Sequence, residues 1–258
     1  MSKLGTDPYK GVRDFYPEDM AIQNYIFNTW RKVAEEKGYV EYSASILEPT
    51  EIYTEKSGAE IVNEQTFTFT DRGDRSVTLR PEMTPTLARM VAARRRNLKF
   101  PLRWYSIPNL FRYERPQRGR RREHWQLNCD LVGVAGIEGD KEIISLAYAV
   151  MKEFGAKDSD FEIRINNSNI DDFKDIVPNI VSDPTLARGQ TYYTGTVFEI
   201  FDTDKENNRA IAGGGRYDNL LEMFEVEPVP AVGFGMGDIT LRDFLETHGL
   251  KMNASRTK

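Results

Sequence analysis

The chain has 258 residues, of which 40% are hydrophobic and 29% are charged, and its formal net charge is -5 at pH 7. No apolar run approaches the roughly 20 residues that span a bilayer, and the first residues lack the apolar core of a signal peptide, so we expect a cytoplasmic protein with no membrane partner. The single cysteine excludes an internal disulfide, and the acidic balance confines any contact with nucleic acid to local basic patches.

Taken in chain order, the first predicted elements are a helix, an extended stretch and a hairpin. Apolar side chains recur at helical spacing from Met20 to Lys37, and Gly38 follows as a helix stop. The residues from Val40 to Glu48 are extended, and EQTFTFTDRGDRSVTLRPE then alternates apolar and polar residues around the turn DRGD. A short helix with a basic end starts at Thr84.

The remaining chain predicts mostly strands. The strand-like runs PLRWYSIPNLFRYE and HWQLNCDLVG flank the arginine-rich RPQRGRRRE, and a helix, DKEIISLAYAVMKEFG, leads to the strand DFEIRINN. Several strands follow one another with no helix between them, which predicts an α+β fold with a mainly antiparallel sheet rather than a parallel doubly wound one. No repeat or linker divides the chain, so we expect one domain over residues 1–258, with the connection 167–183 as the place for an excursion or insertion.

The arginine-rich hairpin carries a polar row. On its return strand, Gln126, Asn128 and Asp130 alternate with apolar residues, so one face packs on the core while the other lines something polar. On the first strand, Arg112 and Glu114 share a face. A solvent-facing sheet with a charged loop would show the same pattern. Guanidinium groups match phosphate bidentately, however, and an arginine cluster in the connecting loop favours a bound anion.

Three other segments hold candidate site residues. Read as a strand, LARGQTYYTGTVFEIFD would place Tyr193, Gly195 and Glu199 on one face, although edge strands also carry stray polar groups. Glu82 could receive an ammonium group or serve as a helix-start residue. GGGRYD offers either a plain turn or a close backbone approach followed by Tyr217. No glycine motif of the phosphate-binding type occurs, so a bound nucleotide would rest on arginines and a sheet.

These segments together resemble a known family. GVRDFYPED, FRYERPQRGRRREHWQ and AVGFGMGD look like motifs 1, 2 and 3 of class II aminoacyl-tRNA synthetases, and LARGQTYYTGTVFE with GGGRYD looks like the two signatures of histidyl-tRNA synthetases. The resemblance extends from about Tyr9 to Leu250. It implies that ATP and Mg²⁺ activate L-histidine as histidyl-adenylate, that histidine is then transferred to the acceptor end of tRNA(His), and that motif 1 around Pro17 builds a homodimer.

The resemblance also implies a role for individual residues. Tyr193 and Asp130 would contact the imidazole from two sides, and the rest of the histidine pocket would consist of Glu82, Thr84, Gln126, Tyr192, Gly213 and Tyr217. Arg188 and Arg112 would be catalytic and neutralise charge at the α-phosphate. No side chain is assigned as a metal ligand, and the implied ATP-binding residues are Arg112, Glu114, Arg120, His124, Gln126 and Arg242.

The chain departs from the family pattern in several places. The motif 3 arginine that meets the γ-phosphate is absent at Asp238 to Thr240, and Arg242 follows two places later. Asp130 is one methylene shorter than the usual glutamate. The family insertion is reduced to about 168–183, and no anticodon-binding domain follows motif 3. A non-catalytic relative, the histidine-sensing regulatory subunit of ATP phosphoribosyltransferase, also lacks that domain. The phosphate-clamping arginines favour the enzyme, because a sensor needs only the amino-acid pocket.

Overall fold

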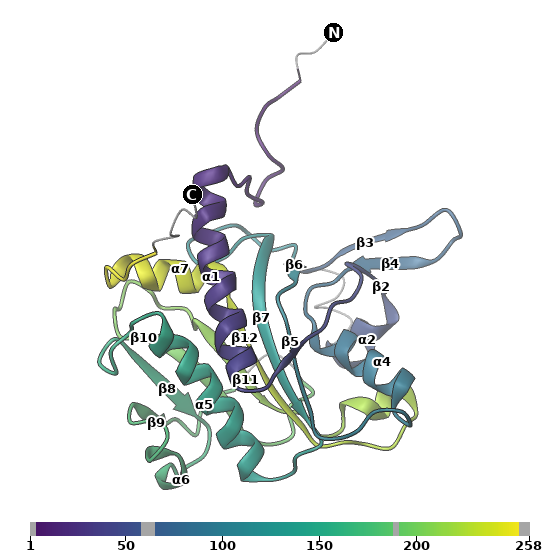
Figure 1. The fold of residues 1–258 in the computed structure, drawn as a ribbon. Coiled ribbons are helices and arrows are strands. Elements are labelled where there is room, and N and C mark those ends of the chain that lie inside the picture. The colour runs from purple at the N-terminus through teal and green to yellow at the C-terminus, as the bar shows by residue number, and fades with distance from the viewer. Residues whose placement is uncertain (1–3, 58–64, 188–190, 253–258) are drawn as a thin grey trace.

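The computed structural model describes residues 4–57, 65–187 and 191–252 (Figure 1). In these ranges, one main sheet contains, in spatial order, β1 (Val40–Glu41), β5 (Leu102–Ser106), β7 (Glu123–Val132), β12 (Ala231–Gly237), β11 (Ala212–Arg216), β10 (Val197–Asp202), β8 (Phe161–Ile165) and β9 (Ile180–Ser182). A further strand, β6 (Asn109–Phe111), pairs with β7. All pairs are antiparallel except β1 with β5 and β8 with β9, so the predicted α+β fold with a mainly antiparallel sheet is confirmed.

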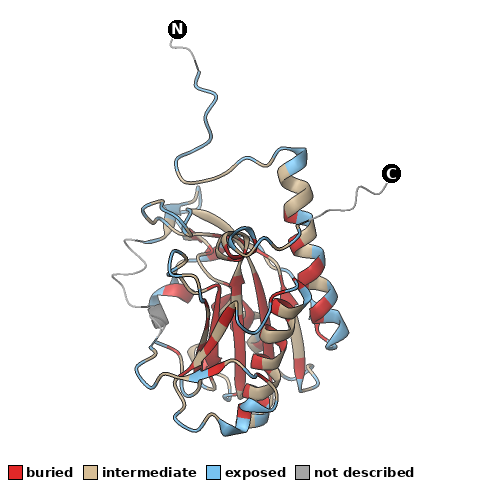
Figure 2. Ribbon diagram, turned by 90° about the vertical axis from the view of Figure 1, so that its left-hand side faces the viewer, coloured by how far each residue is buried: buried red, intermediate tan, exposed pale blue. Residues whose placement is uncertain are grey.

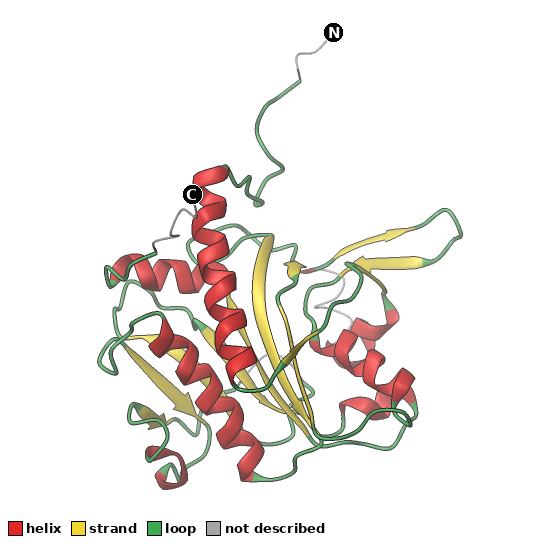
Figure 3. Cartoon of the chain, in the orientation of Figure 1, coloured by secondary structure: helices red, strands yellow, loops and turns green. Residues whose placement is uncertain are grey.

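Two long helices lie side by side over one face of this sheet (Figures 1 and 3). They are α1 (Pro17–Glu36) and α5 (Ile137–Glu153). The first begins at a proline, which suits the first helical turn, and it buries Ile26, Trp30 and Val33. These side chains join Leu127 and Cys129 of β7 in the main core, which Figure 2 shows as the buried layer between helices and sheet.

The opposite face of the sheet is divided between an apolar end and a polar end. Helix α4 (Thr84–Arg94) and the 3₁₀ helix η1 (Leu220–Phe224) cover the apolar end, where Leu87, Leu220 and Val132 share a second core. Beside them lie α2 (Glu51–Ser57) and a small sheet of β2 (Leu47–Pro49), β4 (Ser76–Leu79) and β3 (Phe67–Thr70), of which β3 and β4 form the predicted hairpin. The polar end stays open.

Two short elements complete the described chain. Helix α6 (Asp171–Lys174) lies in the connection between β8 and β9, and α7 (Asp238–Thr247) directly follows β12. None of the helices in the described ranges combines the length and the apolar character that a membrane crossing requires.

The predicted strand through the two tyrosines is wrong in its first half. Strand β10 begins at Val197, and the residues before it are irregular, with a turn at 191–192 and a bend at Gly195. In a regular strand Tyr192 and Tyr193 would point to opposite faces, whereas here both line the same pocket. The backbone bends to allow this, and it stays attached to the sheet because Thr194 N donates to Arg216 O and Arg216 N donates to Thr196 O, both at 2.8 Å.

The glycine run of GGGRYD is a central strand and not a turn. Gly213, Gly214 and Gly215 belong to β11 and are fully enclosed between β10 and β12. A Cβ on Gly214 would lie 2.1 Å from the carbonyl oxygen of Gly233 and 2.7 Å from Cα of Phe234, both backbone atoms. Only glycine therefore permits the close approach of β11 and β12.

We expect Gly214→Ala to lower the free energy of unfolding by about 3 kcal/mol, because the new methyl group must displace backbone of the neighbouring strand. Urea denaturation measures this change. Gly237→Ala is the matched control: the added carbon would meet only Oγ1 of Thr240, at 3.4 Å, and should cost less than about 1 kcal/mol. Equal losses in both variants would contradict the argument.

Candidate active site

The open, polar end of the sheet is built from facing rows of β7 and β12. Asp130 pairs with Gly233 and Asn128 with Gly235 in the strand register. A Cβ on Gly233 would lie 2.3 Å from Oδ1 of Asp130, and one on Gly235 would lie 2.2 Å from Nε2 of Gln126. The glycines of β12 therefore leave the space that the polar side chains of β7 fill, and the predicted polar row is confirmed.

A small pocket opens over these strands. Seven of the residues that the resemblance assigned to histidine binding line it: Glu82, Thr84, Gln126, Tyr192, Tyr193, Gly213 and Tyr217. The eighth, Asp130, does not. The Tyr192 hydroxyl donates to Oε2 of Glu82 at 2.8 Å and joins the two sides of the pocket. The pocket is small, with a volume of about 40 Å³.

Asp130 lies behind the small pocket, beneath Gly233. It is buried, and the buried Tyr217 hydroxyl donates to its Oδ1 in a very short hydrogen bond. Burial raises the pKa of Asp130 to about 7, although the hydrogen bond from Tyr217 opposes this shift. The carboxyl group therefore titrates near neutral pH and touches the pocket through the phenol of Tyr217.

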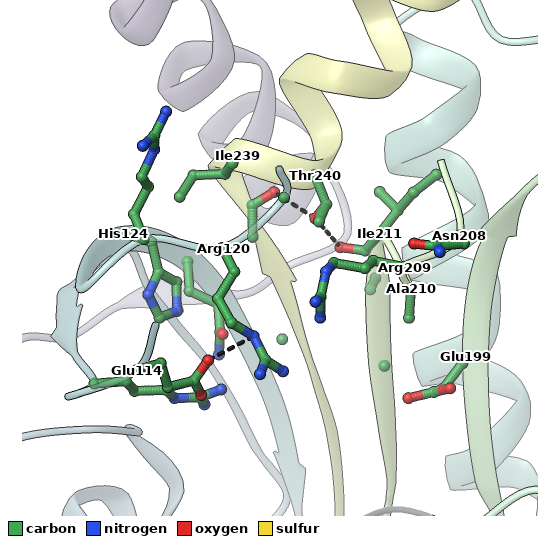
Figure 4. A pocket seen from close by; sticks show the side chains of 18 residues that line it. Glu114, Arg120, His124, Glu199, Asn208, Arg209, Ala210, Ile211, Ile239 and Thr240 are labelled. Carbon is green, nitrogen blue, oxygen red and sulfur yellow. Dashed lines mark hydrogen bonds and ion pairs between the residues drawn. The ribbon is translucent and has the colours of Figure 1, made fainter. Parts of the chain in front are cut away.

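A larger pocket of about 410 Å³ adjoins the first (Figure 4). It contains Arg112, Glu114, Arg120, His124 and Gln126, which the resemblance assigned to ATP binding, and Nε of Arg120 lies 2.5 Å from Oε2 of Glu114. Burial, and next the Arg112 guanidinium, lower the pKa of His124 to about 3, so its ring is neutral at physiological pH. The positive charges around this cavity come from arginines and not from His124.

Arg112 stands where the two pockets meet. It lines both of them, together with Gln126, Gly213 and Gly235. Its half-buried side chain is held by a hydrogen bond from Nε to the carbonyl oxygen of Pro81 at 3.0 Å. The other guanidinium nitrogens therefore remain available to a ligand that extends from one pocket into the other.

The structure does not place Arg242 in either pocket. Its Nε donates to Glu246 of the same helix at 2.8 Å, and its Nη1 lies 3.9 Å from Asp19 of α1. The first turn of α7 presents Thr240 to the pocket, and the side chain of Arg242, two residues further, lies on another face of the helix. The other predicted catalytic residue, Arg188, lies outside the described residues.

Sequence reasoning missed Asn208 and Arg209, which line the large pocket from the loop before β11. The signal was present, because NNR ends at Arg209, three residues before the glycine strand begins. Sequence reasoning also left the role of Arg216 in GGGRYD open. Its buried guanidinium pairs with buried Asp140, with Nε to Oδ1 at 2.9 Å, and so braces β11 against α5.

The chain is similar to known proteins. A family model described as histidyl-tRNA synthetase matches residues 11–173 and 168–239. The histidine–tRNA ligase of Leptospira biflexa is 38% identical over 334 aligned positions, covering 97% of this chain and 76% of that protein, and that of Thermoplasma volcanium is 37% identical, covering 94% and 75%.

Solved structures agree with the sequence comparisons. Apo histidyl-tRNA synthetase of S. aureus superposes with a TM-score of 0.80 at 27% identity, covering 97% of this chain and 72% of that one. A Bacillus halodurans structure described as an ATP phosphoribosyltransferase regulatory subunit/histidyl-tRNA synthetase has a TM-score of 0.77 at 22% identity, covering 95% and 84%, and this likeness concerns the fold.

The antiparallel sheet and its arginine-lined open end define a fold of the class II aminoacyl-tRNA synthetase type. Within that class, the chain belongs to the histidyl-tRNA synthetase family.

Proposed function

We propose that the chain activates L-histidine with ATP and transfers it to tRNA(His). The observation that carries this proposal is the continuity of two pockets through Arg112: the smaller is lined by carboxylate, amide and phenol groups, and the larger by arginines. An amino acid in the first and a polyphosphate in the second would meet at the guanidinium.

In the proposed first step, an oxygen of the histidine carboxylate attacks the α-phosphorus of ATP. The bond from phosphorus to the oxygen that bridges to the β-phosphate breaks, and pyrophosphate leaves. Arg112 neutralises the charge on the α-phosphate oxygens, and Glu82 and Gln126 hold the α-amino group. In the second step, a terminal ribose hydroxyl of tRNA attacks the carbonyl carbon, and AMP leaves.

Magnesium fits the larger pocket only if the phosphates of ATP supply part of its ligands. The described ranges contain no group of three carboxylate, histidine or cysteine side chains that could hold a metal by themselves. Mg²⁺ usually binds through one or two carboxylates plus substrate phosphates, and Glu114 and Glu199 both line this pocket. When bound there, the ion would neutralise charge on the phosphate oxygens.

Histidine-dependent exchange of pyrophosphate into ATP, measured without tRNA and with the other amino acids as controls, tests the proposal. We expect exchange with histidine alone, followed by charging of tRNA(His). Histidine binding by calorimetry without exchange would instead indicate a histidine sensor, the function that the alternative of a regulatory paralogue predicts. The arginines of the larger pocket support the enzyme, because a sensor of histidine has no use for them.

We further propose that residues 168–183 are a shortened form of a family insertion and that the chain is one catalytic domain. Two observations support this: the alignment with the Leptospira protein needs 334 positions for 258 residues, and the two family-model matches meet at residues 168–173. A homodimer through the segment around Pro17, at the start of α1, stays a prediction, which sedimentation measurements can test.

A further inference from the structure

Arg209 faces the larger pocket without a partner of its own. Its half-buried side chain comes from the loop before β11, and Figure 4 shows the guanidinium directed into the cavity toward Arg120. Within the described ranges it makes no hydrogen bond and no ion pair. Placing an arginine in this way next to another cation is unfavourable unless an anion binds between them.

The stem of Arg209 lies against the arginine-rich loop at Gly119. A Cβ on Gly119 of that loop would lie 2.8 Å from Cδ of Arg209 and 3.5 Å from the methyl carbon of Thr240. Gly119 also has a φ of +69°, which favours glycine. The loop, Arg209 and the start of α7 therefore meet at one point, and the absent side chain of Gly119 leaves room for the stem of Arg209.

The charges of the pocket indicate which ligand Arg209 meets. Among the described residues that line the cavity, Arg112, Arg121 and Arg209 form no ion pair, whereas Arg120 pairs with Glu114. Three guanidinium groups that form no ion pair around one cavity suit a ligand with several negative charges, and each group can bind phosphate oxygens with two parallel hydrogen bonds.

We propose that Arg209 binds the β- and γ-phosphates of ATP and the pyrophosphate that leaves. This inference rests on the proposed activation of histidine by ATP. Arg112, at the junction of the pockets, marks the place of the α-phosphate, and Arg209 lies beyond it beside Thr240. Arg209 thus supplies, from the loop before β11, a positive charge that α7 does not, since Arg242 turns to Glu246 and Asp19.

The test is Arg209→Ala in the exchange assay, with Arg242→Ala as the matched comparison. We expect Arg209→Ala to raise KM for ATP and for pyrophosphate about 10- to 100-fold and to leave KM for histidine within about twofold, because charge-assisted hydrogen bonds to phosphate are lost. Arg209→Lys should recover part of the loss, since it keeps the charge but not the planar group. Arg242→Ala should change none of these three KM values. An unchanged KM for ATP in Arg209→Ala, or a rise in Arg242→Ala only, would overturn the proposal.

Calorimetric titration separates this proposal from the proposed function. AMP lacks the two outer phosphates, so Arg209→Ala should weaken ATP binding about 10-fold or more and leave AMP binding unchanged. If the unaltered chain exchanges no pyrophosphate, the proposed activation of histidine fails. The effect of Arg209→Ala on the ratio of ATP to AMP affinity still decides the role of Arg209. Equal weakening of both ligands would assign Arg209 to the adenosine and overturn the proposal, as would failure of the unaltered chain to bind ATP.

Discussion

Arg112→Ala should reduce histidine-dependent pyrophosphate exchange by about 1,000-fold or more while it changes the free energy of unfolding by less than about 1 kcal/mol. The loss is expected because the guanidinium stands where the two pockets meet and would neutralise charge at the reacting phosphate. Stability should change little, because among the described residues the half-buried side chain makes one hydrogen bond, from Nε to the Pro81 carbonyl oxygen. Single-turnover formation of histidyl-adenylate and urea denaturation measure the two quantities.

Two further variants test whether the loss of activity is specific to the guanidinium of Arg112. Arg112→Lys keeps the charge but cannot form the bidentate contact, and it should recover only a small part of the activity. Arg118→Ala removes another arginine of the same hairpin, whose exposed side chain reaches Glu206 and Asn207, and it should leave the rate within about threefold. Exchange at the unaltered rate in Arg112→Ala would remove this residue from the catalytic site.

Asp130→Asn should raise KM for histidine about 100-fold and at the same time stabilise the folded chain at pH 8. The amide keeps the size of the carboxyl group and can still accept from Tyr217, but it would no longer offer a negative charge to a bound imidazole. Stability should rise because a buried carboxylate with a pKa of about 7 is costly to ionise. Exchange kinetics and urea denaturation of the purified variant measure the two effects.

The sign of the pH dependence follows from the direction of the pKa shift. The pKa of Asp130 is raised from 3.8 to about 7 in the folded chain, so the folded state holds this proton more tightly than the unfolded state does. The stabilising contribution is present in full below pH 4 and is lost as the pH rises toward 7. The stability advantage of Asp130→Asn should therefore grow between pH 4 and pH 7 and reach a few kcal/mol, since one pKa unit corresponds to about 1.4 kcal/mol. An advantage that is constant over this range would contradict the assignment.

The sequence predicted the sheet and its polar row because both depend on local alternation. Gln126, Asn128 and Asp130 lie two residues apart, and a strand must place them on one face. The start of β10 was not predictable in this way. Tyr192 and Tyr193 have strong strand propensity, and the bend that turns both toward one pocket depends on contacts with distant residues such as Glu82.

Two arginines also show that local sequence pattern does not decide which side chain reaches the site. Arg209 and Arg242 are equally plausible as phosphate ligands from their types, and Arg242 is nearer to motif 3 in the chain. The helical rotation of α7 turns Arg242 toward Asp19, whereas the loop before β11 brings Arg209 to the cavity. Spacing along a chain gives the face of a helix only when its first residue and its packing are known.

The glycines of β11 and β12 restrict how the amino-acid specificity of this chain can be redesigned. A laboratory library that varies Gly214 or Gly233 should yield mostly unfolded protein, because any added carbon meets backbone atoms of a neighbouring strand. The substitutions that admit a differently shaped amino acid must come from the walls above, such as Tyr192 and Tyr193, which the bend before β10 holds outside the regular sheet. The glycine strands of the site therefore tolerate few changes, and a new amino-acid specificity should arise at the tyrosines above them.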